Sequence, residues 1–232
     1  MKYTVTVHEV KKENNPYLQA MAKIVFGEKA FTVNGIKLLQ NQNGELYVSF
    51  PNKVVYKNGE PVQKDGKVQY RDYANPVTKA FYEEVTNAIK SQYQNNTVTQ
   101  IYHPNEPMTY AVRVTPYRTD VQGDPFRGFA RLWMGSGNNQ EFVVDDIRLY
   151  ENQKGELFAS MPGYKKEDKY IDMAYPASAE FRRELTNAFA QKYVEEIGIM
   201  QGQTRQDTQQ YQTPEEETDW NGAIEDEDEV EL

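Results

Sequence analysis

Residues 36–51 read IKLLQNQNGELYVSFP, and residues 147–162 repeat that stretch as IRLYENQKGELFASMP, with nine of 16 positions identical. The similarity resumes between residues 70–93 and 170–193, where 10 of 24 positions are identical. The offset between the two copies falls from 111 to 100, so the first copy carries an 11-residue insertion before residue 70. A repeat of this kind indicates tandem copies of one domain. We expect copy one over residues 1–93, a polar linker over 94–107 and copy two over 108–197.

Both copies predict the same succession of strands followed by one helix. Apolar residues alternate at the start of each copy, which is typical of a strand with one buried face. After Pro76 and Pro176, apolar residues recur at i, i+4, i+7 and i+8, as on the buried face of an amphipathic helix. The predicted strands lie at 3–7, 18–26, 31–38 and 46–50 in copy one, and at 110–114, 127–134, 142–149 and 157–161 in copy two. The predicted fold class is α+β, with two small antiparallel sheet domains, each closed by a C-terminal helix, that form a pseudo-dimer.

Charge is distributed unequally along the chain. The sequence has 35 acidic and 26 basic residues, and residues 201–232 hold 11 of the acids but one base. This segment therefore carries −10, and the preceding 200 residues carry +1. The total of −9 does not exclude nucleic-acid binding, because the acidic end dominates the sum.

Other classes of protein are excluded more simply. The chain has no cysteine, which excludes disulfides and thiolate metal sites. It has no apolar run of about 18 residues that would cross a membrane. We expect a cytoplasmic protein that has no cofactor, binds no metal and does not contact a membrane.

Two motifs in each copy resemble a known family. Copy one has GELYVSFPNK at 44–53 and YRDYANPV at 70–77, and copy two has GELFASMP at 155–162 and YIDMAYP at 170–176. These motifs resemble the SpoVG (septation regulator) family, whose signature is close to NGLFVAMPSK followed by FRDIAHPI. The resemblance implies a small sheet-and-helix domain that works as a homodimer and binds nucleic acid, so the fused pair looks like a covalent version of that dimer.

The resemblance also implies where contacts lie. Lys53 and Arg71 occupy positions at which the family has basic residues. Copy two has Tyr164 and Ile171 at the equivalent positions. The two halves are therefore not expected to bind identically.

The residues themselves supply the chemistry that nucleic-acid binding requires, and the resemblance is what favours this reading over an ordinary solvated loop. Lysines neutralise phosphates, and tyrosine rings stack on bases of any sequence. The loop over 51–70 is basic, and its residues 64–67, KDGK, predict a hairpin tip; the matched loop over 163–170 is basic as well. Bases at polar positions of the strands, Arg113 among them, predict a groove across both copies. The candidate contacts are Lys53, Tyr56, Lys57, Lys64, Lys67, Arg71, Tyr164, Lys165, Lys166, Lys169, Lys23, Lys37, Arg131 and Arg148. Ordinary solvated loops and solubilising strand positions are the alternative reading.

Residues 198–232 are expected to form a disordered acidic tail. Residues 201–212 are rich in Gln and Thr and have no apolar period. The rest is similar to the tails of single-stranded-DNA-binding proteins, which implies recruitment of replication or repair proteins or competition with DNA for the groove. This chain ends Val-Glu-Leu and lacks the usual Pro-Phe, and a tail that only aids solubility is the alternative. The tail candidates are Trp220, Ile224, Glu225, Asp226, Glu227, Asp228, Glu229 and Leu232.

Catalysis has little support. The only histidines, His8 and His103, occupy unrelated positions in the two copies, and no catalytic triad, metal-binding spacing or phosphate-cradling glycine loop is present. We therefore predict a non-enzymatic protein, monomeric as a pseudo-dimer or assembled further, that binds single-stranded DNA with low sequence specificity. A sequence-specific duplex DNA or RNA regulator and a protein–protein adaptor are the alternatives.

Overall fold

The computed structural model describes residues 1–10, 15–28, 30–117 and 123–210 of the chain. The chain divides into two compact units, Met1–Ile197 and Gly198–Leu232. Both copies of the repeat lie in the first unit. Within the described part of the chain, no helix is both long and apolar enough to cross a membrane.

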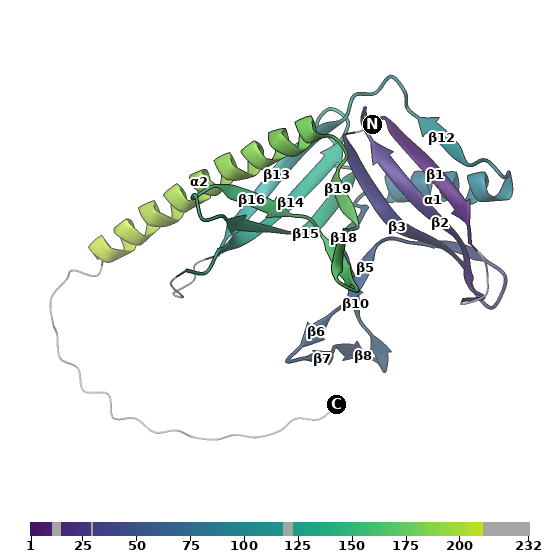
Figure 1. Cartoon of the computed structure of the whole chain (residues 1–232), viewed down its shortest axis with the longest axis horizontal. Helices are drawn as coiled ribbons and strands as arrows, with labels where there is room; N and C mark the ends of the chain where they lie inside the picture. The colour runs from purple at the N-terminus through teal and green to yellow at the C-terminus, as the bar shows by residue number, and fades with distance from the viewer. Residues whose placement is uncertain (11–14, 29, 118–122, 211–232) are drawn as a thin grey trace. The chain divides into compact units, whose positions relative to one another are not determined.

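Copy one forms most of one antiparallel sheet, whose strands run in the order β12-β1-β2-β3-β19, with β4 also paired to β3 (Figure 1). Copy two forms most of a second sheet, in the order β11-β15-β14-β13, with β16 paired to β15. Apolar residues alternate along these strands because one face of each sheet is buried. The first sheet comprises β1 (Tyr3–Glu9), β2 (Leu18–Phe26), β3 (Phe31–Gln40), β4 (Leu46–Ser49), β12 (Thr99–Tyr102) and β19 (Ala174–Pro176). The second comprises β11 (Ala74–Pro76), β13 (Thr109–Pro116), β14 (Phe126–Gly135), β15 (Phe142–Glu151) and β16 (Leu157–Ser160).

Each copy completes the sheet of the other. Ala174 of copy two faces Val33 of β3, and Ala74 of copy one faces Val144 of β15, so the exchange is reciprocal. The same hydrogen bond precedes each exchanged strand: the Asn34 N–H donates to the Met173 carbonyl, and the Asp145 N–H donates to the Tyr73 carbonyl, both at 2.7 Å. Neither copy therefore has a complete sheet without the other.

The buried side chains of both copies form one hydrophobic core. Phe142 of copy two is fully buried, and its ring centre lies 4.8 Å from that of Phe26 and 6.2 Å from that of Phe50, both in copy one. Burial of one such side chain contributes about 1.5–3 kcal/mol. The two copies thus share the packing that stabilises them.

The predicted helices are present. α1 (Lys79–Gln94) begins where the Thr78 hydroxyl accepts from the Phe81 N–H at 3.2 Å. α2 (Ala179–Gln210) begins in the same way, with the Ser178 hydroxyl accepting from the Phe181 N–H at 3.1 Å. Such a cap stabilises a helix by about 1 kcal/mol. Among the described residues, the apolar side chains that the helices bury are Phe81, Val85, Ala88 and Ile89 in α1 and Phe181, Leu185 and Phe189 in α2.

Residues 198–210, which were expected to begin a disordered tail, continue α2 in the structure. Gln, Met and Arg have good helix propensity, and no proline occurs between Pro176 and Pro214. The absence of an apolar period therefore did not end the helix. All the tail candidates, Trp220, Ile224, Glu225–Glu229 and Leu232, lie outside the described residues.

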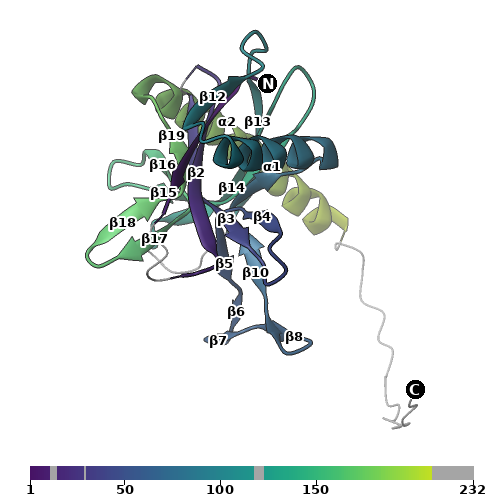
Figure 2. The same ribbon diagram turned by 90° about the vertical axis from the view of Figure 1, so that its right-hand side faces the viewer.

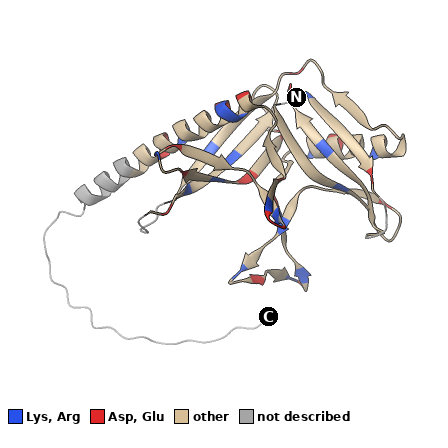
Figure 3. Ribbon diagram, viewed as in Figure 1, with Lys and Arg blue, Asp and Glu red and all other residues tan. Residues whose placement is uncertain are grey.

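Two hairpins project from the sheets (Figures 1 and 2). In copy one β5 (Asn52–Val54) pairs with β10 (Tyr70–Asp72), and the insertion adds two short hairpins beyond them. Asn58-Gly59 and Asp65-Gly66 turn these additions with positive φ, as tight two-residue turns require. The hairpin tip predicted at 64–67 is confirmed, because Lys64 faces Lys67. Figure 3 shows basic residues both on these hairpins and along the strands of the sheets. The remaining strands are β6 (Tyr56–Lys57), β7 (Glu60–Pro61), β8 (Gln63–Lys64) and β9 (Lys67–Val68) in copy one, and β17 (Gly163–Lys166) and β18 (Lys169–Asp172) in copy two.

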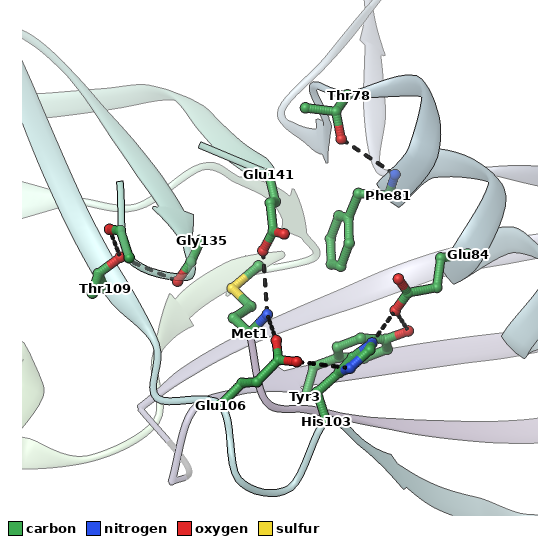
Figure 4. A network of polar contacts seen from close by, with 11 residues as sticks. Met1, Tyr3, Thr78, Phe81, Glu84, His103, Glu106, Thr109, Gly135 and Glu141 are labelled. Atoms are coloured by element: carbon green, nitrogen blue, oxygen red, sulfur yellow. Dashed lines mark hydrogen bonds and ion pairs between the residues drawn. The ribbon is translucent and has the colours of Figure 1, made fainter. Parts of the chain in front are cut away.

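The segment predicted as a linker, 94–107, is structured. Its strand β12 pairs with β1, with Tyr102 opposite Tyr3. Just beyond it, His103 Nε2 lies 2.9 Å from Glu84 Oε1, and His103 Nδ1 lies 3.3 Å from Glu106 Oε1 (Figure 4). The Met1 amine bridges Glu106 at 3.1 Å and Glu141 at 3.3 Å, which ties the segment to copy two. Pairing with the edge strand β1 gave this polar segment a structure that its composition did not indicate.

Candidate nucleic-acid interface

Three of the predicted contact residues pair with two aspartates at the junction between the copies. Lys53 of β5 forms a close ion pair with Asp146 of β15, and its amine lies 5.3 Å from the ring centre of Tyr73. Arg131 of β14 donates from Nε to Asp145. Arg71 Nη2 lies 3.8 Å from Asp145 Oδ2. Lys53 and Arg71, the two positions that the resemblance implies, thus connect copy one to copy two.

A bulge in the sheet explains why aspartates stand at this place. β3 and β15 each break register with the preceding strand, between Ala22 and Ile24 and between Ala130 and Leu132. In copy one the bulge holds Gly35 with φ 74°, and a Cβ there would lie 1.8 Å from Met173 Cε. In copy two the equivalent residue is Asp146, with φ 62°. Aspartate tolerates this left-handed conformation better than most residues, and here its carboxylate reaches Lys53.

A pocket of about 530 Å³ opens on the exposed face of the copy-two sheet. Asp145 and Asp146 belong to its lining, together with four arginines: Arg71, Arg113, Arg131 and Arg148. Arg113 faces Arg131 across β13 and β14, an unfavourable pairing that the Arg131–Asp145 contact relieves. Within the described part of the chain, Arg113 and Arg148 form no ion pair. We call this site the arginine pocket.

The ionisation of Arg148 is secured by its neighbours. Partial burial alone would lower the pKa of its guanidinium. A hydrogen bond with Tyr150 and the negative charge of Asp146 outweigh that effect, so the pKa of Arg148 is raised above its ordinary value. Arg148 therefore presents a permanent positive charge to the pocket.

The equivalent position in copy one is a pocket of about 400 Å³ with different chemistry. Its lining includes Met21, Ile171 and Met173, with Tyr73 and Tyr164 beside them. Lys37 is its single basic residue. We call this site the apolar pocket.

The hairpins carry the other predicted contacts. Lys57, Lys64 and Lys67 are exposed on the insertion of copy one, and Lys165 and Lys169 are exposed on the hairpin of copy two. Lys166 belongs to the same strand, β17. Exposed tyrosines accompany them: Tyr56 is 62% exposed, Tyr70 62%, Tyr164 46% and Tyr170 59%.

Lys23 and Lys37 are exposed on the copy-one sheet, where they face Thr6 and Met21. The candidates therefore fall into three groups: a paired set at the junction, a free set on the hairpins and a set on the strand faces. Asp145, Asp146 and Tyr73 were missed as site residues. The signal for the two aspartates was their alignment with Asn34-Gly35 in the first copy, where a turn-forming pair occupies the bulge.

Comparison with known proteins agrees with this two-copy organisation. A family model, SpoVG, matches residues 1–95 and 108–195. The SpoVG protein of Agathobacter rectalis is 42% identical over 60 residues, which cover 25% of this chain and 68% of the relative. That of Acetivibrio thermocellus is 43% identical over 56 residues, covering 24% and 58%.

The SpoVG protein of Finegoldia magna is 38% identical over 60 residues, covering 25% of this chain and 55% of the relative. The chain thus spans little more than half the length of two of these three relatives, and all three are named for septation. No solved structure matches the chain. Because the model matches two separate segments that together make up most of the sequence, the chain belongs to the SpoVG family and contains two tandem copies of its domain.

Proposed function

We propose that this chain is a non-enzymatic nucleic-acid-binding protein that binds single-stranded DNA with low sequence specificity. The observation that carries the proposal is the pairing of exposed tyrosines with lysines on both projecting hairpins. Tyr56 precedes Lys57 on β6, and Lys165 faces Tyr170 between β17 and β18. Solvent-exposed rings beside cations suit a strand whose bases are unstacked.

The energetics favour a single strand over a duplex. Stacking of one base on an aromatic side chain is worth about 1–3 kcal/mol and does not depend on the base. In a duplex the base faces are already stacked on one another, so the tyrosines would gain little. The lysines add affinity by releasing counterions from the phosphates, which makes binding depend on salt.

The ion pairs at the junction change how the basic residues are ranked. Lys53 and Arg71 contact carboxylates, so part of their charge is already compensated. Lys57, Lys64, Lys67, Lys165 and Lys169 carry no ion pair within the described residues. The hairpin lysines are therefore the stronger candidates for phosphate contacts, and Lys53 and Arg71 act chiefly by holding the copies together.

The acidic tail supplies the second part of the proposal. Its charge of −10 is opposite in sign to the lysines of the proposed binding surface. The tail therefore competes with the nucleic-acid strand for that surface, or it recruits replication or repair proteins. A full-length variant that has amides in place of all 11 acidic residues of 201–232, the tail-neutralised variant, removes this charge without shortening the chain. We expect it to bind single strands more tightly than the unmodified protein at low salt.

Fluorescence anisotropy with a labelled thymidine oligonucleotide tests the proposal. Between about 50 and 200 mM salt, the logarithm of the association constant is expected to fall linearly with the logarithm of the salt concentration. The slope is expected to be about 0.7 for each phosphate contact. Lys64→Gln/Lys67→Gln removes two such contacts and is expected to reduce that slope by about 1.4, whereas the matched control Lys79→Gln/Lys154→Gln, outside both hairpins, leaves it unchanged. Failure of the tail-neutralised variant to bind any single strand at low salt would refute the proposal.

A sequence-specific duplex DNA or RNA regulator is the second candidate. The relatives are named for septation, and a role in one particular process favours a regulator over a protein that binds any strand. Competition between a single strand and a duplex of the same sequence separates the two candidates. Stronger competition by the duplex supports the regulator.

A further inference from the structure

The two copies present equivalent pockets with opposite chemistry. Arg148 aligns with Lys37, and Asp146 aligns with Gly35, at the same register positions of β15 and β3. The exchanged segments differ in the same way, since Arg71 of the arginine pocket aligns with Ile171 of the apolar pocket. Lys53 aligns with Tyr164. Charged or polar residues around one pocket thus correspond largely to apolar or uncharged residues around the other.

The arginine pocket has the chemistry of a phosphate site. With Lys53, five cations surround two aspartates, which leaves three positive charges without compensation. Among the described residues Arg113 and Arg148 form no ion pair, although Asp146 and Tyr150 act on Arg148, so donors of both guanidinium groups remain for an incoming anion. Guanidinium groups bind phosphate oxygens through paired, charge-assisted hydrogen bonds. The pocket volume of about 530 Å³ lies within the usual range of ligand sites, about 300–1,000 Å³.

The apolar pocket adjoins it. Tyr73 belongs to the lining of the apolar pocket, and its carbonyl accepts the hydrogen bond from Asp145 of the arginine pocket. The Lys53 amine lies over the Tyr73 ring and pairs with Asp146. Lys53 and Tyr73 therefore lie between the arginine pocket and the apolar pocket. The methionine and tyrosine side chains of the apolar pocket offer contacts to the faces of a flat ring, and Asn34 and Asn52 also belong to its lining. A nucleobase matches this combination of apolar faces and amide groups.

We propose that one nucleic-acid strand crosses the junction between the copies, with a phosphate in the arginine pocket and a base in the apolar pocket. This inference rests on the proposed function and deepens it. A symmetric dimer offers two identical sites, so a strand can bind in either direction. Here each chain offers one phosphate site and one base site, so it binds one strand in one direction.

Variants of the full-length protein test the phosphate site. Arg113→Gln/Arg148→Gln removes two positive charges from the arginine pocket. The control Lys79→Gln/Lys154→Gln also removes two positive charges, but from positions outside both pockets. We expect the first variant to weaken binding of a thymidine oligonucleotide by at least about tenfold and the second by less than about twofold. Neither arginine forms an ion pair within the described residues, so the first variant is expected to keep the thermal unfolding midpoint of the unmodified protein.

Cross-linking of the unmodified protein tests the base site and the direction without any substitution. Short strands carry a photoreactive iodouracil at either the 5′ or the 3′ end, and cross-linked peptides are identified by mass spectrometry. We expect cross-links to the peptides of Tyr73, Tyr164 and Met173 from one end only, and native mass spectrometry is expected to show one strand per chain.

The outcomes separate this inference from the function on which it rests. If the unmodified and tail-neutralised proteins bind no single strand, the proposed function fails and this inference fails with it. If they bind but Arg113→Gln/Arg148→Gln behaves like the control, or both ends cross-link equally, or two strands bind per chain, the inference alone is overturned.

Discussion

Replacement of Phe142 by alanine tests whether the two copies unfold as one cooperative unit. Phe142 belongs to copy two, but its ring packs against Phe26 and Phe50 of copy one. It is fully buried, and a Phe-to-Ala change in such a core costs about 3–5 kcal/mol. In a protein of this size each kcal/mol lowers the unfolding midpoint by about 2–4 °C. The expected loss is therefore about 6–20 °C.

Differential scanning calorimetry gives the assay. We expect one transition in the unmodified protein and one transition, at a lower temperature, in Phe142→Ala, because reciprocal strand exchange prevents either sheet from persisting alone. Phe158→Ala is the matched control: Phe158 also belongs to copy two, but it is 46% exposed. Its midpoint is expected to change by less than about 4 °C. Two separate transitions, of which only the one from copy two moves in Phe142→Ala, would refute the reasoning.

Three further changes probe the junction and the pH dependence. A double-mutant cycle of urea unfolding combines Lys53→Ala with Asp146→Ala. The expected coupling energy is about 1 kcal/mol, because the ion pair is only partly buried. A coupling energy near zero would contradict the role of this pair in joining the copies. Gly35→Ala is expected to lower the free energy of unfolding by about 1–2 kcal/mol, because residue 35 has a left-handed conformation. Met173→Ala removes the close Cε contact and is not expected to restore that loss. Full recovery in the double variant would assign the cost to the contact instead. Partial burial raises the pKa of the Asp172 carboxyl, although Arg182 opposes this, so the folded state loses stability as pH rises through the raised pKa. Asp172→Asn is therefore expected to be more stable than the unmodified protein at neutral pH and to lose that advantage below the ordinary aspartate pKa, as thermal unfolding across pH would show; an equal advantage at all pH values would contradict this cause.

Local patterns predicted much of the fold. Alternation at Tyr3, Val5 and Val7 predicted the first strand, and the stripe from Phe81 to Ile89 predicted the first helix, because burial of one face imposes the period of the element itself. Lys64 and Lys67 were correctly placed at a hairpin tip, since Asp-Gly favours a tight turn. Polar segments were harder: residues 99–102 form a strand by pairing with β1, and residues 198–210 continue a helix without an apolar face to indicate it.

The candidate site was predicted in part. Tyr56, Tyr164, Lys57 and Lys165 were expected to be accessible, and they are exposed. Lys53, Arg71 and Arg131 were predicted as nucleic-acid contacts, and in the structure they pair with Asp145 and Asp146, which the sequence did not indicate. Those aspartates lie 74 or more positions from Lys53 and Arg71 in the sequence. A contact between residues so far apart in the sequence depends on which strands pair. The composition of a segment does not predict that pairing.

The sequence by itself determined the repeat, the type of each main element and the division of charge between the body and the acidic end, because these depend on neighbouring residues or on a direct count. The tertiary structure alone decided that the copies exchange strands and that their equivalent pockets differ. Strand exchange brings Arg71 of one copy to Arg113, Arg131 and Arg148 of the other, and brings Ile171 and Met173 to Met21. The chemistry of each pocket is thus set by side chains from both copies, which become neighbours only when the two sheets complete each other.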